Sequence, residues 1–157
     1  MDRTKIVSFK LASLLKDNGY DDDTYFRINK DGMLATCGFL MNYNEDKLLF
    51  SAPTVSEAVD WAEDKYNIFI EVNYQQIDHS FENKFMYIVY DVEKEPFDGN
   101  MILASSTKFE SKNKALEHAL IKFLSTRAKS YIKAQIKSVK EEIGIDVEIN
   151  SKKISIN

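Results

Sequence analysis

The chain offers few side chains that could form or break covalent bonds. Its 157 residues include one cysteine, Cys37, and two histidines, His79 and His118. A thiolate beside an imidazole can act as a nucleophile, and the two residues need only be close in space. A lone cysteine in a strand is more often a small residue facing the interior. Catalysis through Cys37 is therefore kept only as a third hypothesis, behind the two binding functions described below.

The sequence carries no recognisable metal or cofactor motif. A zinc site needs several Cys or His at short spacing, and the five glycines are isolated, which excludes a glycine-rich phosphate loop. The run Asp21–Asp23 supplies oxygen atoms of the kind that calcium prefers, but Tyr25 and Arg27 stand where a calcium loop needs ligands. No carboxylate pair stands out for acid–base catalysis. We therefore expect no metal ion and no cofactor.

A ridge of lysines near the C-terminus could bind phosphate groups. The stretch from Lys108 to Lys140 holds nine Lys and Arg against two Glu. Three- and four-residue spacing would place four of them on one side of a helix, namely Lys129, Lys133, Lys137 and Lys140. Such a ridge suits nucleic-acid backbones, but the pI of about 5.3 is low for that class, and Tyr131 is the single aromatic residue after Phe123. Nucleic-acid binding is the alternative function.

Charge is divided unevenly along the chain. Residues 1–107 contain 19 acidic and 10 basic residues, a net charge of −9, whereas residues 108–157 contain 6 acidic and 11 basic residues, a net charge of +5. Opposite signs in two parts of one chain indicate an interacting tail, a nucleic-acid contact, or a match between arm and body. A solvated helix face rich in lysine, which is a good helix former, would also explain the basic part.

The same C-terminal stretch has an apolar stripe that needs a partner. Its residues recur at helical spacing and are Tyr131, Ile132, Ile136, Val139 and Ile143. Residues 145–156 alternate in the manner of a terminal β-hairpin, whose edge could accept another strand. If the body leaves the stripe uncovered, a protein partner or a second copy of the chain would bury it. We expect these residues to form a partner-binding surface.

Apolar spacing and turn residues predict the order α-β-β-α-β-β-β-α-(α)-β-β. Thr54 and Glu57 fit a capping box at the start of the second helix, and the predicted strands of the body cover residues 25–28, 33–39, 48–50, 68–75, 85–92 and 101–109. Strands joined by short turns favour a mainly antiparallel sheet with helices packed on one face, an α+β fold. A long C-terminal helix and the terminal hairpin complete it.

The helix that follows Ser111 sets the predicted domain boundary. Its apolar pattern allows one helix over residues 112–142, or two helices with a break near Ser125 and Thr126. The sequence therefore predicts a compact α+β domain at residues 1–125 and a helical arm with a hairpin at residues 126–157.

Composition and apolar run lengths indicate the compartment in which the protein is expected. Hydrophobic residues make up 44% and charged residues 29% of the chain, which is typical of a globular domain. A single cysteine cannot form an internal disulfide. Lys10 interrupts the apolar run that a signal peptide would need, and no stretch approaches the length of a membrane span. We expect a cytoplasmic protein without a membrane partner.

Three stretches together resemble a known group of sequences. They are Ser51–Thr54 leading to Trp61, the strand Tyr66–Asn73, and Phe109–Ser111 leading into Ala115–Leu120. Over residues 6–124 the chain resembles small uncharacterised proteins encoded by phages and prophages of gut Bacteroidetes. The resemblance implies a phage-type accessory protein, found in the host cytoplasm or in the virion, where it would be a virion component or a modulator of a host factor. Together with the apolar stripe, it favours non-catalytic protein–protein binding as the function.

Overall fold

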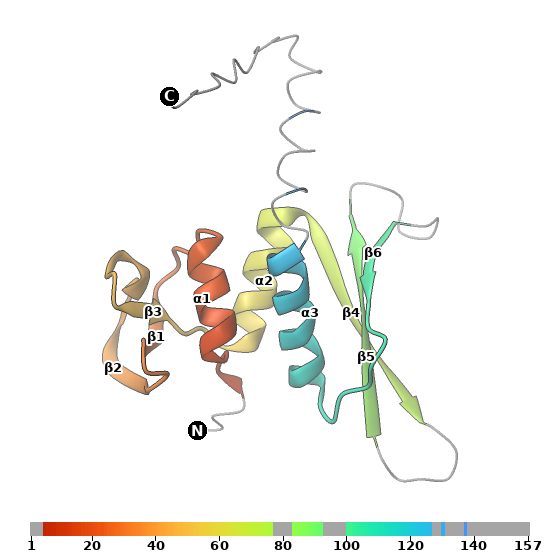
Figure 1. Ribbon diagram of the computed structural model, residues 1–157, viewed down its shortest axis with the longest axis horizontal. Coiled ribbons are helices and arrows are strands. Elements are labelled where there is room, and N and C mark those ends of the chain that lie inside the picture. The colour runs from red at the N-terminus through yellow and green to blue at the C-terminus, as the bar shows by residue number, and fades with distance from the viewer. Residues whose placement is uncertain (1–4, 77–82, 93–99, 127–129, 131–136, 138–157) are drawn as a thin grey trace, which may run out of the picture.

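The computed structural model describes residues 5–76, 83–92 and 100–126, together with Ser130 and Lys137. The described residues form three α-helices and two small antiparallel sheets, which confirms the predicted α+β class, and Figure 1 shows the helices between the two sheets. The helices and strands, in chain order, are α1 (Phe9–Asp17), β1 (Thr24–Asn29), β2 (Leu34–Met41), the single-turn 3-10 helix η2 (Tyr43–Glu45), β3 (Leu49–Ser51), α2 (Val55–Tyr66), β4 (Ile68–Gln76), β5 (Asn83–Asp91), β6 (Met101–Ala104) and α3 (Lys112–Thr126).

The first sheet has the order β2-β1-β3, so that β2 and β3 are its edge strands among the described residues. A tight turn joins β1 to β2, in which Gly32 adopts a φ of 78° and donates its amide to the carbonyl of Asn29 at 2.9 Å. The side chain of Asn29 accepts from the amides of Asp31 and Met33, which fixes the turn locally. The register of the β1–β2 pairing changes between the pairs Thr24–Met41 and Phe26–Thr36.

The second sheet has the order β4-β5-β6 and is antiparallel throughout. Alternate residues of its strands point into the core, where Ile68, Ile70, Tyr87 and Val89 are all buried. Helices α2 and α3 pack against this inner face, while α1 contacts both α3 and β3. The helices thus form a middle layer, and each sheet has one side turned away from them (Figure 1).

Local signals in the sequence fix the helix ends. Ser8 caps α1 by accepting the amide of Leu11 at 3.4 Å. The predicted capping box of α2 is confirmed: the hydroxyl of Thr54 accepts the amide of Glu57 at 3.2 Å, and the Glu57 carboxylate accepts the amide of Thr54 at 2.6 Å. Asn67 ends α2 in the left-handed region, with a φ of 51°.

The core lies where the three helices meet the second sheet. Tyr66 of α2 and Phe123 of α3 are fully buried and meet edge to face, with ring centroids 5.2 Å apart. Leu11 and Leu15 of α1 are likewise fully buried. Large side chains from all three helices therefore share one core, which holds the helical layer together.

The structure differs from the sequence expectation in two details. The body strands divide into two sheets instead of one, because α1 and α2 lie between β1–β3 and β4–β6. The sixth body strand is shorter than predicted and stops at Ala104, although Phe109 returns to pair with Phe85 in an isolated bridge. Within the ranges described, no helix combines the length and apolar character needed to cross a membrane.

The predicted features of the C-terminal segment fall largely outside the described residues. This applies to the terminal hairpin, to the whole apolar stripe, and to Lys129, Lys133 and Lys140 of the lysine ridge. Lys137 is described, and it is helical and exposed, as is Ser130. The division at residue 126 and the choice between one helix and two stay predictions.

Candidate functional site

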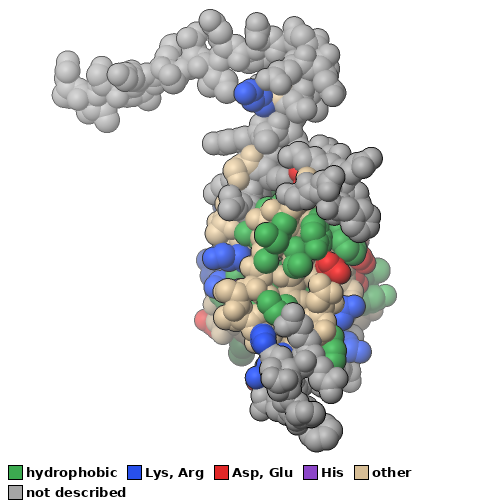
Figure 2. Space-filling model, turned by 90° about the vertical axis from the view of Figure 1, so that its right-hand side faces the viewer, with side chains coloured by type: hydrophobic (Ala, Val, Ile, Leu, Met, Phe, Trp, Pro, Cys, Tyr) green, Lys and Arg blue, Asp and Glu red, His purple; other side chains and the backbone are tan. Residues whose placement is uncertain are grey.

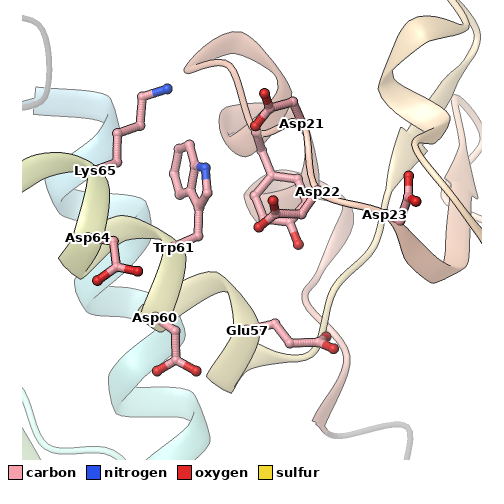
Figure 3. Close-up of a pocket in the computed structure, with 9 residues that line it drawn as sticks. Asp21, Asp22, Asp23, Glu57, Asp60, Trp61, Asp64 and Lys65 are labelled. Atoms are coloured by element: carbon pink, nitrogen blue, oxygen red, sulfur yellow. The ribbon is translucent and has the colours of Figure 1, made fainter.

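Six acidic side chains surround a cleft of about 600 Å³ on the outer side of α2. Asp21–Asp23 come from the loop that follows α1, and the other acidic residues come from α2 itself, as Figure 3 shows. The lining residues are Tyr20, Asp21, Asp22, Asp23, Glu57, Asp60, Trp61, Asp64 and Lys65. Six carboxylates and one ammonium give the cleft a formal net charge of −5.

Helical spacing explains the acidic side of the cleft. Glu57, Asp60 and Asp64 are three and four residues apart, so that they lie on one ridge of α2, opposite its buried side chains. Glu57 also belongs to the capping box, where one carboxylate oxygen accepts from both the amide and the hydroxyl of Thr54. Sequence alone predicts no acid–base role for these carboxylates.

An aromatic ring and a cation occupy the same cleft. The ammonium of Lys65 lies 5.0 Å from the centroid of the Trp61 ring, a distance at which a cation is attracted to an indole face. The same ammonium donates to the carbonyl of Gly19 at 3.4 Å. In Figure 3, Trp61 stands between Lys65 and the loop that carries Asp21 and Asp22. The chain itself therefore places one ammonium group against this ring.

Tyr20 is the buried polar residue of the cleft. Its side chain is only 3% exposed, and its ring packs against Trp61 with centroids 5.3 Å apart. Burial, followed by the negative charges of Asp22, Glu57 and Asp21, holds the pKa of its phenol well above the usual range. Among the described residues, the buried hydroxyl that has no hydrogen-bond partner is that of Tyr43 and not that of Tyr20. The Tyr20 hydroxyl thus stays protonated beside these carboxylates.

A second unusual surface is the strand β2. Seven of its eight residues are exposed, and its sequence Leu-Ala-Thr-Cys-Gly-Phe-Leu-Met contains no charged residue. The exposed fractions are 63% for Phe39, 50% for Leu40 and 46% for Met41. Edge strands usually carry charges or proline that prevent pairing with other chains. This edge has neither.

The outer face of the second sheet is also apolar. Figure 2 looks onto this face and shows hydrophobic side chains gathered in its centre. Phe69 and Met101 are 51% and 57% exposed, and Ile88 and Tyr90 share this face because they pair with Glu71 and Phe69. The hydroxyl of Tyr90 donates to Glu71 at 3.0 Å, a bond that raises the pKa of the phenol. This face includes the charged Glu71, whereas β2 has no charged residue.

The hypothetical cysteine–histidine pair has no structural counterpart in the described residues. Cys37 is half-buried in β2, beside Tyr43. His118 lies on α3, where its Nδ1 is 3.1 Å from the hydroxyl of Tyr87 and its ring is 4.9 Å from that of Phe109. His79 lies outside the described residues. Cys37 therefore lies beside Tyr43, and His118 contacts Tyr87 and Phe109; the two residues do not form a pair.

The acidic residues of the cleft do not converge on one point. In the part of the chain that the structure describes, no three His, Cys, Asp or Glu side chains are grouped closely enough to hold a metal ion. Carboxylates spread along a cleft give it a negative potential. The cleft is therefore a region of negative potential on the described surface.

Comparison with known protein families, with curated proteins and with solved structures found no match to this chain. The functional argument therefore rests on the surfaces described above. The sequence contained both halves of the acidic cleft, but it offered no signal that the loop at Asp21–Asp23 packs beside α2.

Proposed function

We propose that this is a phage-type accessory protein, a virion component or a modulator of a host factor, that works by binding protein and not by catalysis. The partner that the described surface fits best is a second copy of the chain, paired through β2. The observation that carries the proposal is the exposed, uncharged edge of β2.

The chemistry of β2 supports pairing with its own copy. An edge strand presents unpaired backbone donors and acceptors, which a second strand can satisfy. Two copies related by a two-fold axis would bring β2 against β2, and the absence of charge means that no like charges would meet. Phe39, Leu40 and Met41 are exposed to water in a monomer. Pairing would cover part of their apolar surface, and this burial would favour the dimer in free energy.

The test is the mass of the full chain by light scattering after size exclusion, over a range of concentrations. We expect a mass near twice 18.1 kDa for the natural sequence. Phe39→Lys places a charge on the edge and should weaken association at least tenfold, while the far-ultraviolet circular dichroism stays unchanged because this side chain is exposed.

Met101→Lys is the matched control, because Met101 is an equally exposed apolar residue on the other sheet. This variant should remain a dimer. A dimer that is lost with Met101→Lys and kept with Phe39→Lys would move the contact to the outer face of the second sheet and contradict the assignment to β2. A natural chain that stays at 18.1 kDa at every concentration would overturn self-association.

A further inference from the structure

We infer that Cys37 is a site of oxidation by peroxide, and that the sulfenic acid formed on its Sγ accepts a hydrogen bond from the buried hydroxyl of Tyr43. The site lies where η2 packs against the first sheet. It uses side chains on one face of that sheet and not the backbone edge of β2, so that it is separate from the proposed dimer contact.

The hydroxyl of Tyr43 is a buried polar group without a partner. The residue is only 3% exposed, and within the described residues its hydroxyl has no hydrogen-bond partner. An unpaired buried donor costs free energy, and a phenylalanine at this position would fill the same space without that cost. The hydroxyl therefore indicates a group that it meets in another chemical state of the protein.

Hydrogen bonds of η2 fix the Tyr43 ring against the first sheet. The amide of Tyr43 donates to the buried hydroxyl of Ser51 in β3 at 3.0 Å, and the amide of Asp46 donates to the carbonyl of Tyr43 at 3.2 Å. The guanidinium carbon of Arg27 lies 5.8 Å from the centroid of the Tyr43 ring. The phenol is thus held in place by its own backbone and by a neighbour on β1.

Cys37 shares this face of the sheet. Ala35 pairs with Arg27 across the two strands, and Cys37 comes two residues later in β2, so that its side chain points to the same side. Contact with the Cys37 thiol, followed by burial, raises the pKa of the Tyr43 phenol, whereas the charge of Arg27 lowers it. A thiol is only a weak acceptor, and it leaves the Tyr43 hydroxyl unsatisfied. The sulfur therefore has an unused donor beside it.

The thiol is open to a small oxidant. Cys37 is half-buried, and its neighbours Thr36 and Gly38 are both exposed. Partly exposed cysteines in electropositive surroundings are those that peroxides oxidise. Arg27 supplies a positive charge on this face. Hydrogen peroxide is small enough to reach a half-buried sulfur from solvent.

The reaction oxidises sulfur and reduces the peroxide. The Sγ of Cys37 attacks one oxygen of hydrogen peroxide, so that an S–O bond forms and the O–O bond breaks. The other oxygen leaves as hydroxide and takes up the proton of the thiol, which gives water. The oxygen left on sulfur carries lone pairs that can accept the O–H of Tyr43. The unpaired donor is therefore satisfied only after oxidation, which stabilises the sulfenic acid.

Reduction needs a thiol from outside the chain. Cys37 is the single cysteine, so that the sulfenic acid cannot form an internal disulfide. A low-molecular-weight thiol such as glutathione would condense with it, releasing water and forming a mixed disulfide. A second such thiol would then exchange with this disulfide and restore Cys37.

The test measures the lifetime of the sulfenic acid in the natural full-length chain. The protein is treated with hydrogen peroxide, catalase removes the excess, and dimedone, a cyclic dione that traps sulfenic acids, is added after increasing delays. Intact mass spectrometry gives the fraction that carries the dione. We expect a labelled fraction that declines slowly with delay, and no label on Cys37→Ser, because the chain has no other cysteine.

Tyr43→Phe removes the donor and keeps the ring. The sulfenic acid should disappear about threefold to tenfold faster in this variant, as expected for the loss of one hydrogen bond. The melting temperature of the reduced protein should be unchanged or raised, because its hydroxyl makes no hydrogen bond. Tyr74→Phe is the matched control, because Tyr74 is an exposed tyrosine of the second sheet, and it should leave the lifetime unchanged.

Access to the sulfur is measured separately. Iodoacetamide should alkylate the reduced thiol of the natural chain and of Tyr43→Phe at similar rates. Alkylation that accelerates by the same factor as the loss of sulfenic acid would attribute the effect to access and overturn the role of Tyr43. Equal lifetimes in the natural chain and in Tyr43→Phe would overturn it as well.

Two further outcomes would overturn the site itself. One is a natural chain that acquires no label and keeps its free thiol after peroxide treatment. The other is conversion of the thiol to a disulfide between two copies, seen on a non-reducing denaturing gel. Pairing through β2 is measured by the mass of the reduced protein and oxidation by the dione label, so that each proposal can fail without the other.

Discussion

Glu117 of α3 accepts a hydrogen bond from the backbone amide of Ser8, with its Oε1 2.6 Å from the nitrogen. The two residues are 109 positions apart in the sequence. Ser8 is the N-cap of α1, so the carboxylate sits where the helix presents unpaired amides and a partial positive charge. One side chain therefore joins the start of the first helix to the last helix of the described body.

The first prediction concerns this link. Glu117→Ala removes both the acceptor and the charge, and should lower the free energy of unfolding by about 1 kcal/mol. Glu117→Gln keeps an acceptor and should lose about half of that. Urea denaturation followed by circular dichroism measures both. Glu110→Ala removes an exposed carboxylate that pairs with Lys114 within the same segment and should change stability little. Equal losses for Glu117→Ala and Glu110→Ala would show that the link between the two helices does not stabilise the fold.

The second prediction concerns the pH dependence of Glu63. Burial raises the pKa of this carboxyl, the hydrogen bond from the amide of Ile70 at 2.8 Å opposes the rise, and Asp60 and Asp64 add to it. A raised pKa means that Glu63 binds its proton more tightly in the folded protein than in the unfolded chain. The stabilising contribution is present below the ordinary pKa of a glutamate and is lost as pH rises through the folded value.

Glu63→Gln keeps the acceptor for Ile70 and removes the charge. We therefore expect a higher melting temperature than that of the natural chain at pH 7, and a difference that shrinks towards zero by about pH 3, where the glutamate is neutral. Thermal unfolding across this pH range measures the effect. An equal increase in melting temperature at pH 7 and at about pH 3 would contradict this prediction. It would mean that the glutamine side chain stabilises the fold for a reason other than the loss of charge.

The third prediction concerns Tyr20. Tyr20→Phe keeps the ring that packs on Trp61 and removes a hydroxyl that lies close to the negative charges of Asp22, Glu57 and Asp21, so that the melting temperature should be unchanged or slightly raised. A clear loss of stability would show instead that the hydroxyl supports the fold.

Sequence by itself determined the local features of this protein. The capping box of Thr54 and Glu57 was predicted and is confirmed, and the left-handed end of α2 at Asn67 and the turn at Asn29–Gly32 are local features of the same kind. Each of them depends on hydrogen bonds between residues no more than four positions apart, so that residue type and spacing are enough to specify it. The α+β class followed from the order of these elements.

Tertiary structure alone decided how the elements meet. The division of the strands into two sheets, the exposure of β2, and the cleft between Asp21–Asp23 and α2 all depend on which side of the helical layer each segment packs. The contact of Tyr20 with Trp61 brings together residues 41 positions apart in the chain. Such contacts are chosen by burial of the whole core, as in the pairing of Tyr66 with Phe123, and no local pattern of apolar or charged residues encodes them.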